Sequence, residues 1–149
     1  AMHLAVASVN SVPVIIHVRE AMDDAIKIID ACDPGEGGGV FHCFSGSSSH
    51  VREILDRGFH ISFTGMVTFK NFTNADAVRA VPLDRLLLET DSPYMTPSPH
   101  RGRRNEPSML IHTARRLAEL YGISCEELAE RTTSNACRLF GIDTEKDRG

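Results

Sequence analysis

Four polar residues stand at or just after the ends of four apolar segments. They are His17 in PVIIHV, His42 in GVFHCF, Thr64 in FHISFTG and Asp91 after RLLLET. In a parallel sheet the carboxyl ends of the strands meet at one end, so we expect these side chains to converge. Imidazole and carboxylate groups together form the ligand set of Zn²⁺, Mn²⁺ and similar ions. The pattern therefore predicts a divalent metal site made by His17, His42 and Asp91.

Other readings of these residues stay open. A single His17 is also typical of a structural histidine that has found a polar partner. Glu89 lies two residues before Asp91, on the same face of an ideal strand. Because two close carboxylates repel unless a cation or an arginine intervenes, Glu89 is either part of the metal site or paired with Arg19 or another base. In that second case Asp91 caps the next turn.

An arginine-rich segment runs from Pro97 to Pro107, where proline and glycine keep the chain irregular. It follows Asp91 directly and is expected to overhang the same end of the sheet. Arg101, Arg103 and Arg104 suit bidentate contacts with phosphate. The alternative is a solvated loop whose arginines pair with nearby acids. Ser45, with the glycine and serine that follow it, offers weaker evidence of backbone N–H groups for an anion at a helix start.

The elements that position these residues alternate between apolar and amphipathic segments. Strands are predicted over residues 13–18, 39–44, 59–65 and 85–90, and the first is expected to be buried on both faces. Helices are predicted over residues 20–32, 47–57, 74–80 and 107–121, then a short helix from Ser124 and a last one over 133–140. Loops are predicted at 33–39 and in a polar, frayed tail at 143–149. A repeat of about 25 residues favours βα units and a parallel sheet.

Composition limits the classes of function. The chain has 149 residues, with 16 Lys and Arg against 20 Asp and Glu, a net charge of −4. This excludes a generally basic surface for nucleic acid, but not a local groove or bridging metal ions. The apolar runs are far shorter than the roughly 20 residues of a membrane span, so no membrane partner is predicted. The four cysteines form no CxxC pair and no signal segment is visible, which predicts reduced thiols and a cytoplasmic location.

Five segments together resemble the TatD family of metal-dependent hydrolases. They are PVIIHVRE, GVFHCFSG, ISFTGMVTFKN, DRLLLETDSPYM and RGRRNEP, and their order and spacing match across residues 11–142. The resemblance implies a TIM barrel of the amidohydrolase-like type, with one or two Mg²⁺, Mn²⁺ or Zn²⁺ ions at the carboxyl ends of the strands. It also implies a deoxyribonuclease, with single-stranded DNA as the substrate.

The resemblance carries roles onto particular residues. It implies that His17 and His42 are metal ligands, and that Asp91 is the metal-binding carboxylate that orients and deprotonates the attacking water. Further residues of the family pattern are expected to line or brace the site. The candidate substrate-binding residues are Arg19, Ser45, Arg101, Arg103 and Asn105, and Glu89 and Glu106 are expected behind the metal ligands.

The chain departs from the family pattern in two places. The family begins with an HxH pair and adds a glutamate ligand on a middle strand, whereas here His3 is followed at position 5 by Ala5. A complete (β/α)8 barrel takes about 250 residues. Residues 1–142 therefore resemble the carboxyl-terminal half, a partial TIM barrel of the α/β class with about four parallel βα units and an open apolar edge. In this resemblance residues 4–10 are the end of the helix that precedes these units.

This departure sets our expectation for the isolated chain. We expect it to be poorly active or inactive as a nuclease, and to pair with a second copy or with the missing half. Two other functions stay open: hydrolysis of an ester or amide bond on the same scaffold, and a half-barrel without catalysis.

Overall fold

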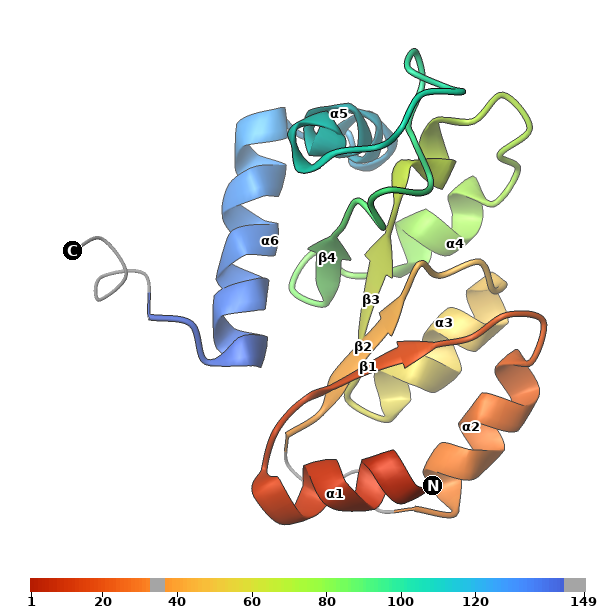
Figure 1. Cartoon of the computed structure of the whole chain (residues 1–149), viewed down its shortest axis with the longest axis vertical. Helices are drawn as coiled ribbons and strands as arrows, with labels where there is room; N and C mark the ends of the chain where they lie inside the picture. Colours follow the sequence, from red (N-terminus) through yellow and green to blue (C-terminus); the bar gives the residue numbers. More distant parts are fainter. Residues whose placement is uncertain (33–36, 144–149) are drawn as a thin grey trace.

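A four-stranded parallel sheet lies at the centre of the computed structural model, which describes residues 1–32 and 37–143 (Figure 1). The strands are β1 (Val14–His17), β2 (Gly39–His42), β3 (His60–Phe63) and β4 (Leu86–Leu88). Their order in the sheet is β1-β2-β3-β4, so each strand pairs with its neighbour in the sequence. Each strand falls within a predicted segment, and the predicted partial barrel of parallel βα units is confirmed.

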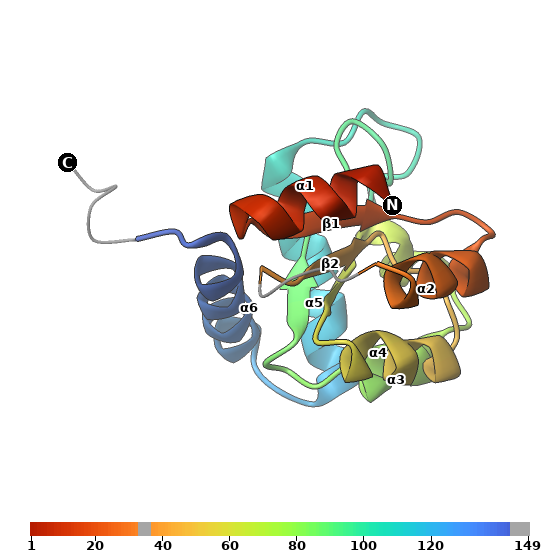
Figure 2. The ribbon, with the colours of Figure 1, turned by 90° about the horizontal axis from the view of Figure 1, so that it is seen from below.

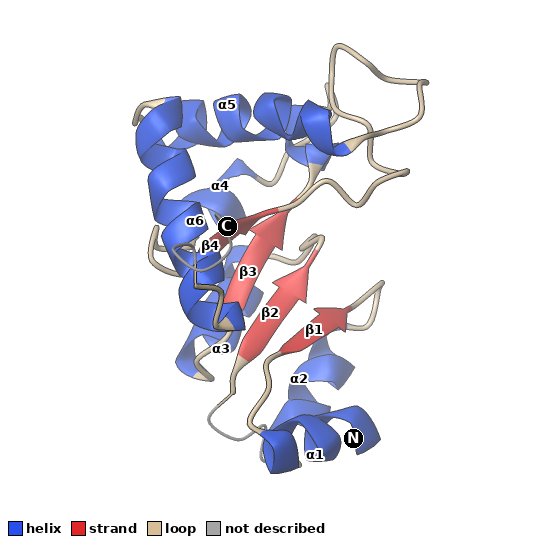
Figure 3. Ribbon diagram, turned by 60° about the vertical axis from the view of Figure 1, so that its left-hand side comes forward, coloured by secondary structure: helices blue, strands red, loops and turns tan. Residues whose placement is uncertain are grey.

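Helices connect the strands and cover one face of the sheet. The helices are α1 (Met2–Asn10), α2 (Met22–Asp30), α3 (Ser48–Asp56), α4 (Ala75–Ala80), α5 (Leu110–Tyr121) and α6 (Cys125–Phe140), with 3₁₀ turns η1 (Gly65–Thr68) and η2 (Pro107–Met109). Figures 2 and 3 show α2, α3 and α4 together on one side, while α6 runs beside β4. Helix α1 lies next to β1, at the end of the sheet where the strands begin (Figure 3).

The core fills the space between the sheet and these helices. Phe41 on β2 and Phe59 just before β3 meet edge to face, with ring centroids 5.6 Å apart. Val51 and Ile54 on α3 are fully buried against them, and each contributes about 1.5–3 kcal/mol relative to an exposed side chain. This layer holds the strands in register, and the register in turn places the polar residues at their ends.

The first strand is not buried on both faces, as its apolar run had predicted. Val14 and Ile16 pack against the core, but Ile15 between them is 65% exposed. Ile15 lines an open groove together with Leu4 of α1 and Ile28 of α2, so the face that carries it is covered only in part.

A second difference concerns the last helices. The predicted short helix from Ser124 and the helix over 133–140 are one helix, α6. Thr132, which lies between the two predicted helices, is buried within α6, and its hydroxyl donates to the carbonyl of Leu128 one turn earlier, at 2.9 Å. Ser124 caps the helix as predicted, accepting from the Glu127 N–H at 3.0 Å.

Two predicted loops extend beyond what the structure describes. Residues 33–36 of the predicted 33–39 loop and residues 144–149 of the predicted tail lie outside the described residues. Within the described ranges, no helix has both the length and the apolar character needed to cross a membrane.

Candidate functional site

Two histidines meet at the carboxyl ends of β1 and β2. The parallel register places His17 directly beside His42. The Nδ1 atom of His17 lies 2.9 Å from Nε2 of His42, and the two rings are tilted by 41°. One nitrogen must carry the shared hydrogen when no other partner lies between them. The predicted convergence of these two side chains is therefore present.

Glu89, just after β4, holds the second of these rings from behind. Its Oε2 atom accepts from His42 Nδ1 at 2.8 Å, which leaves Nε2 of His42 directed at His17. Its other oxygen accepts from the Cys43 backbone N–H and from the Ser62 hydroxyl, both at 2.5 Å. One of the two alternatives for Glu89 was that it pairs with Arg19 or another base. It does pair with a base, which is His42 and not Arg19.

The carboxylate contacts of Glu89 join the ends of three strands. His42 ends β2, Ser62 lies within β3, and Glu89 itself follows β4. Ser62 was not identified from the sequence. Its position inside the apolar run HISF could have indicated a role, because a buried hydroxyl needs a hydrogen-bond partner. The network fixes the orientation of the His42 ring and with it the tautomer that presents Nε2.

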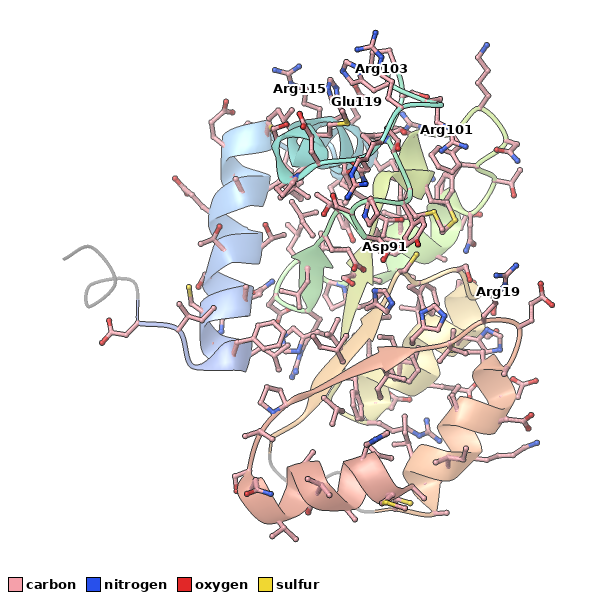
Figure 4. All side chains as sticks on the ribbon, in the orientation of Figure 1. Arg19, Asp91, Arg101, Arg103, Arg115 and Glu119 are labelled. Carbon is pink, nitrogen blue, oxygen red and sulfur yellow. The ribbon has the colours of Figure 1, made fainter. Side chains whose placement is uncertain are left out.

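Asp91 lies in the loop that leaves β4. The strand ends at Leu88, and Asp91 has a left-handed backbone with φ of 54°, so the ideal-strand argument that placed it on one face with Glu89 does not hold. In Figure 4 it lies between the sheet and the loop that carries Arg101 and Arg103. Its backbone carbonyl accepts from the Tyr94 N–H at 2.8 Å, which closes the turn that follows.

Cys43 lies among these groups and was not singled out by the sequence. Its backbone is left-handed, with φ of 50°, and its Sγ atom lies 3.6 Å from the Thr64 hydroxyl. Burial raises the pKa of the Cys43 thiol, and the negative charges of Glu89 and Asp91 raise it further, against a lowering by Thr64. The thiol is therefore held in its neutral form near the two carboxylates.

The spacing of the two histidines suits a shared metal ion. Two nitrogen ligands of one ion lie about 3 Å apart in a square-planar and about 3.4 Å apart in a tetrahedral arrangement, given bonds of about 2.0–2.1 Å. The 2.9 Å between His17 and His42 is close to this range, so the pair fits as two ligands. Among the residues that the structure describes, no group of three His, Cys, Asp or Glu side chains is close enough to hold an ion. Asp91 as the third ligand stays a prediction.

The predicted substrate-binding residues are spread over the same end of the molecule. Arg101 stacks on Phe69 at 3.8 Å from the ring centroid and donates to the Thr96 carbonyl at 3.1 Å. Arg103 is exposed, and Figure 4 shows it pointing away from Asp91. Arg19 is exposed after β1, in a different part of the view. The structure does not bring these arginines together into one cluster.

Asn105 has a bracing position. It is only 3% exposed, and its amide donates to the Thr90 carbonyl at 2.8 Å and the Tyr94 carbonyl at 2.6 Å. Its Oδ1 atom accepts from the Glu106 N–H at 3.0 Å. Because both amide hydrogens are used, Asn105 shapes the turn after Asp91, and this geometry does not favour a direct contact with substrate. Glu106 is exposed and accepts from the Ser108 hydroxyl at 2.7 Å.

The predicted anion site near Ser45 is occupied by the protein's own groups. Ser47 caps α3 by accepting from the His50 N–H, and Nδ1 of His50 accepts from the Ser47 N–H at 3.2 Å. Nε2 of His50 in turn bonds Asp23 at 3.0 Å. Ser45 itself is exposed. The start of α3 therefore has fewer free N–H groups for an anion than the sequence suggested.

The segment after Asp91 is positioned by a close approach to β3. A Cβ atom on Gly65 would collide with the carbonyl oxygen of Met95 and crowd Pro97. Thr68 in the same 3₁₀ turn accepts from the Ser98 N–H at 2.8 Å. The arginine-rich loop is thus anchored over the end of β3 at its first residues.

A curved parallel sheet, with imidazoles and carboxylates gathered where its strands end, defines the class of α/β-barrel proteins whose sites lie at the carboxyl ends of the strands. The model of the TatD related DNase family matches residues 1–141, and the chain belongs to this family. The predicted resemblance is confirmed.

Curated relatives carry related names. The chain is 46% identical over 145 residues to the uncharacterized metal-dependent hydrolase YcfH of Escherichia coli K12, covering 97% of this chain and 55% of that protein. It is 45% identical over 141 residues to YabD of Bacillus subtilis, with the same general name, covering 94% and 55%. It is 38% identical over 145 residues to the 3'-5' ssDNA/RNA exonuclease TatD of Erwinia amylovora, covering 93% and 56%. The chain spans about half the length of these relatives.

Solved structures agree with the family. The TatD homologue YJJV of Escherichia coli K12 superimposes with a TM-score of 0.87 at 30% identity, covering 94% of this chain and 54% of that one. A TatD family hydrolase of Entamoeba histolytica, at 22% identity, gives a TM-score of 0.79 over 93% of this chain and 54% of its own, and supports the fold alone.

Proposed function

We propose that the protein to which this chain belongs hydrolyses phosphodiester bonds, with single-stranded DNA as its substrate. The observation that carries the proposal is the polar chain from His17 through His42 to Glu89, placed at the carboxyl ends of the strands with Asp91 on the following loop. Family membership supports hydrolysis with a divalent metal ion. One relative, named a 3'-5' ssDNA/RNA exonuclease, supports the choice of nucleic acid.

The residues have distinct roles in this proposal. His17 and His42 would hold the ion, which would be Mg²⁺, Mn²⁺ or Zn²⁺, and Glu89 keeps Nε2 of His42 directed at His17. When bound, the ion polarises a phosphoryl oxygen and lowers the pKa of water. Asp91 orients the attacking water and accepts its proton. Arg101 and Arg103 contact the flanking phosphates, a role for which guanidinium groups are suited.

A second candidate is hydrolysis of a carboxylic ester or amide on the same scaffold. It is favoured by the placement of the arginines, since Arg103 points away from Asp91 and Arg101 is held by Phe69 and Thr96. If these arginines bind phosphate only weakly, the hydrolytic site has no selectivity for nucleic acid.

A chimera tests the proposal in a protein of full length. The aligned segment of the Erwinia amylovora TatD exonuclease is replaced by this chain, and release of nucleotides from a 3'-labelled single-stranded DNA is measured with Mn²⁺. We expect turnover by the chimera, and a loss of about 10³-fold or more when Asp91→Ala removes the proton acceptor. The isolated chain should show little turnover.

The matched control is Asp76→Ala, which removes an exposed carboxylate on α4 whose ion pair with Arg79 is worth little. This variant should keep the rate of the chimera. A folded chimera that cleaves ester or amide substrates but no DNA would replace the nuclease proposal with the second candidate. Equal DNA hydrolysis by the Asp91→Ala and Asp76→Ala chimeras would remove Asp91 from the reaction.

A further inference from the structure

A second pair of histidines lies on the loop and helix that follow Asp91. Nε2 of His100 lies 3.1 Å from Nε2 of His112, and the ring centroids are 4.8 Å apart. His100 belongs to the arginine-rich loop, whereas His112 lies in the first turn of α5. Both side chains are half-buried. Neither residue entered the candidate site described above.

The contact repeats the geometry of the first pair. In both pairs two ring nitrogens face each other at about 3 Å, the separation of neighbouring imidazole ligands on one ion. In both, the rings come from segments far apart in the sequence, 25 residues for His17 and His42 and 12 residues for His100 and His112. The second pair differs because the ion pairs of the described residues include none between a carboxylate and either ring.

This donor set selects among metals. Two neutral nitrogens without an oxygen ligand suit Zn²⁺, Ni²⁺ and Cu²⁺, and they are poor ligands for Mg²⁺, which requires oxygen. The charge of Arg115, one turn along α5 from His112, opposes any cation, so only strong imidazole coordination gives useful affinity. We propose that His100 and His112 form a second, separate site for an imidazole-binding transition metal ion, with water completing the coordination.

Such an ion would tie the arginine-rich loop to α5. The loop is already anchored near Gly65 and Thr68 at its start and by Asn105 at its end. Between these anchors lie the exposed residues Arg101, Arg103 and Arg104. A bond between His100 and the helix through a shared ion would hold this exposed stretch still.

The test measures ion count and loop protection on the same chain. Zn²⁺ binding is followed by calorimetry, and trypsin cleavage after Arg101, Arg103 and Arg104 is followed by mass spectrometry. We expect the chain to bind two Zn²⁺ ions and to be cut several-fold more slowly in this loop with Zn²⁺ than with Mg²⁺. His100→Gln and His112→Gln should each lose one ion and the protection. His17→Gln should lose one ion but keep the protection.

The matched control is His3→Gln, which removes an exposed imidazole from α1 and should change neither readout. Two outcomes would overturn the site. One is an unchanged ion count in both His100→Gln and His112→Gln, which would make the contact a hydrogen bond only. The other is loop cleavage in the original chain that is equally fast with Zn²⁺ and Mg²⁺. An ion count that His17→Gln leaves unchanged would count against the first site and leave this one standing.

Discussion

At the scale of single residues, one carboxylate organises the candidate site. Glu89 accepts from three donors that belong to His42, Cys43 and Ser62. The sequence indicated Glu89 through its spacing from Asp91 and through the family resemblance, which placed it behind the metal ligands. Neither told which base it would meet, because a linear pattern holds no information on that pairing. The pairing depends on strand order and register, which bring residues 42, 62 and 89 to one place.

Glu89→Gln tests this role. An amide offers one acceptor where the carboxylate offered two, so at least one of the three donors loses its partner. We expect about 1–3 kcal/mol lower free energy of unfolding in urea. We also expect about 10- to 100-fold weaker Zn²⁺ binding at His17 and His42, because the supporting contact is lost.

Glu119→Gln is the matched change, at an exposed carboxylate on α5 that pairs with Arg116. It should cost less than about 0.5 kcal/mol and leave Zn²⁺ binding unchanged. If the two variants behave alike, Glu89 does not position His42.

At the scale of elements, periodicity located the four strands and helices α2 to α5, whereas α1 was expected only from the family resemblance and α6 was predicted as two helices. The strand over 85–90 was predicted three residues too long. The Glu89 N–H still donates to the Phe63 carbonyl at 3.3 Å, but the chain then leaves the sheet, and Asp91 has a left-handed backbone with φ of 54°. Helix α6 remained whole through Thr132, and Asn135 on this helix donates to the carbonyls of Leu83 and Leu86. Such long-range side-chain bonds leave no trace in local sequence.

Tyr121 makes a similar bond between helices. At the end of α5, its hydroxyl lies 2.6 Å from the carbonyl oxygen of Val78 and 2.7 Å from that of Val81, where α4 ends. Burial raises the pKa of Tyr121 well above its usual range. Tyr121→Phe should lower the free energy of unfolding by about 1 kcal/mol at pH 8.

The sign of the pH dependence follows from this direction. Above the ordinary tyrosine pKa of about 10, the unfolded chain releases the proton first, so stability falls as the pH rises. Tyr121→Phe has no such proton, and Tyr94 remains in both proteins. The difference in unfolding free energy between the two should therefore shrink from pH 8 to pH 11 in urea titrations. A difference that grows with pH contradicts the burial of the hydroxyl.

At the scale of the whole molecule, the open sides of the sheet are the main feature. A groove of about 430 Å³ runs along β1 and is lined by residues that include Ile15 and Ile28, and a second of about 350 Å³ lies beside β4, lined by Leu87, Leu88 and Phe140. Strands β1 and β4 are the outer strands of this sheet, and exposed strand edges are templates for pairing with another chain. The open edge was predictable from the count of four strands, but the partner was not.

We expect the isolated chain to associate through these sides. Its mass by light scattering should exceed the 16.4 kDa of one chain at high concentration. Ile15→Lys should shift the distribution toward one chain by placing a charge on the open face. Val9→Lys, an exposed apolar residue on α1 that is 86% exposed, is the control and should not. A single-chain mass at every concentration would contradict association.

The pairing of His17 with His42 depends on the register of an edge strand that has a neighbour on one side only. A slip of β1 by one residue would turn His17 to the opposite face of the sheet and bring Ile16 or Val18 into its place. The NMR resonances of these two imidazole rings would therefore report on the register of β1. The first event that disables this protein need not be unfolding, because a shift of β1 by about 3.3 Å would be enough.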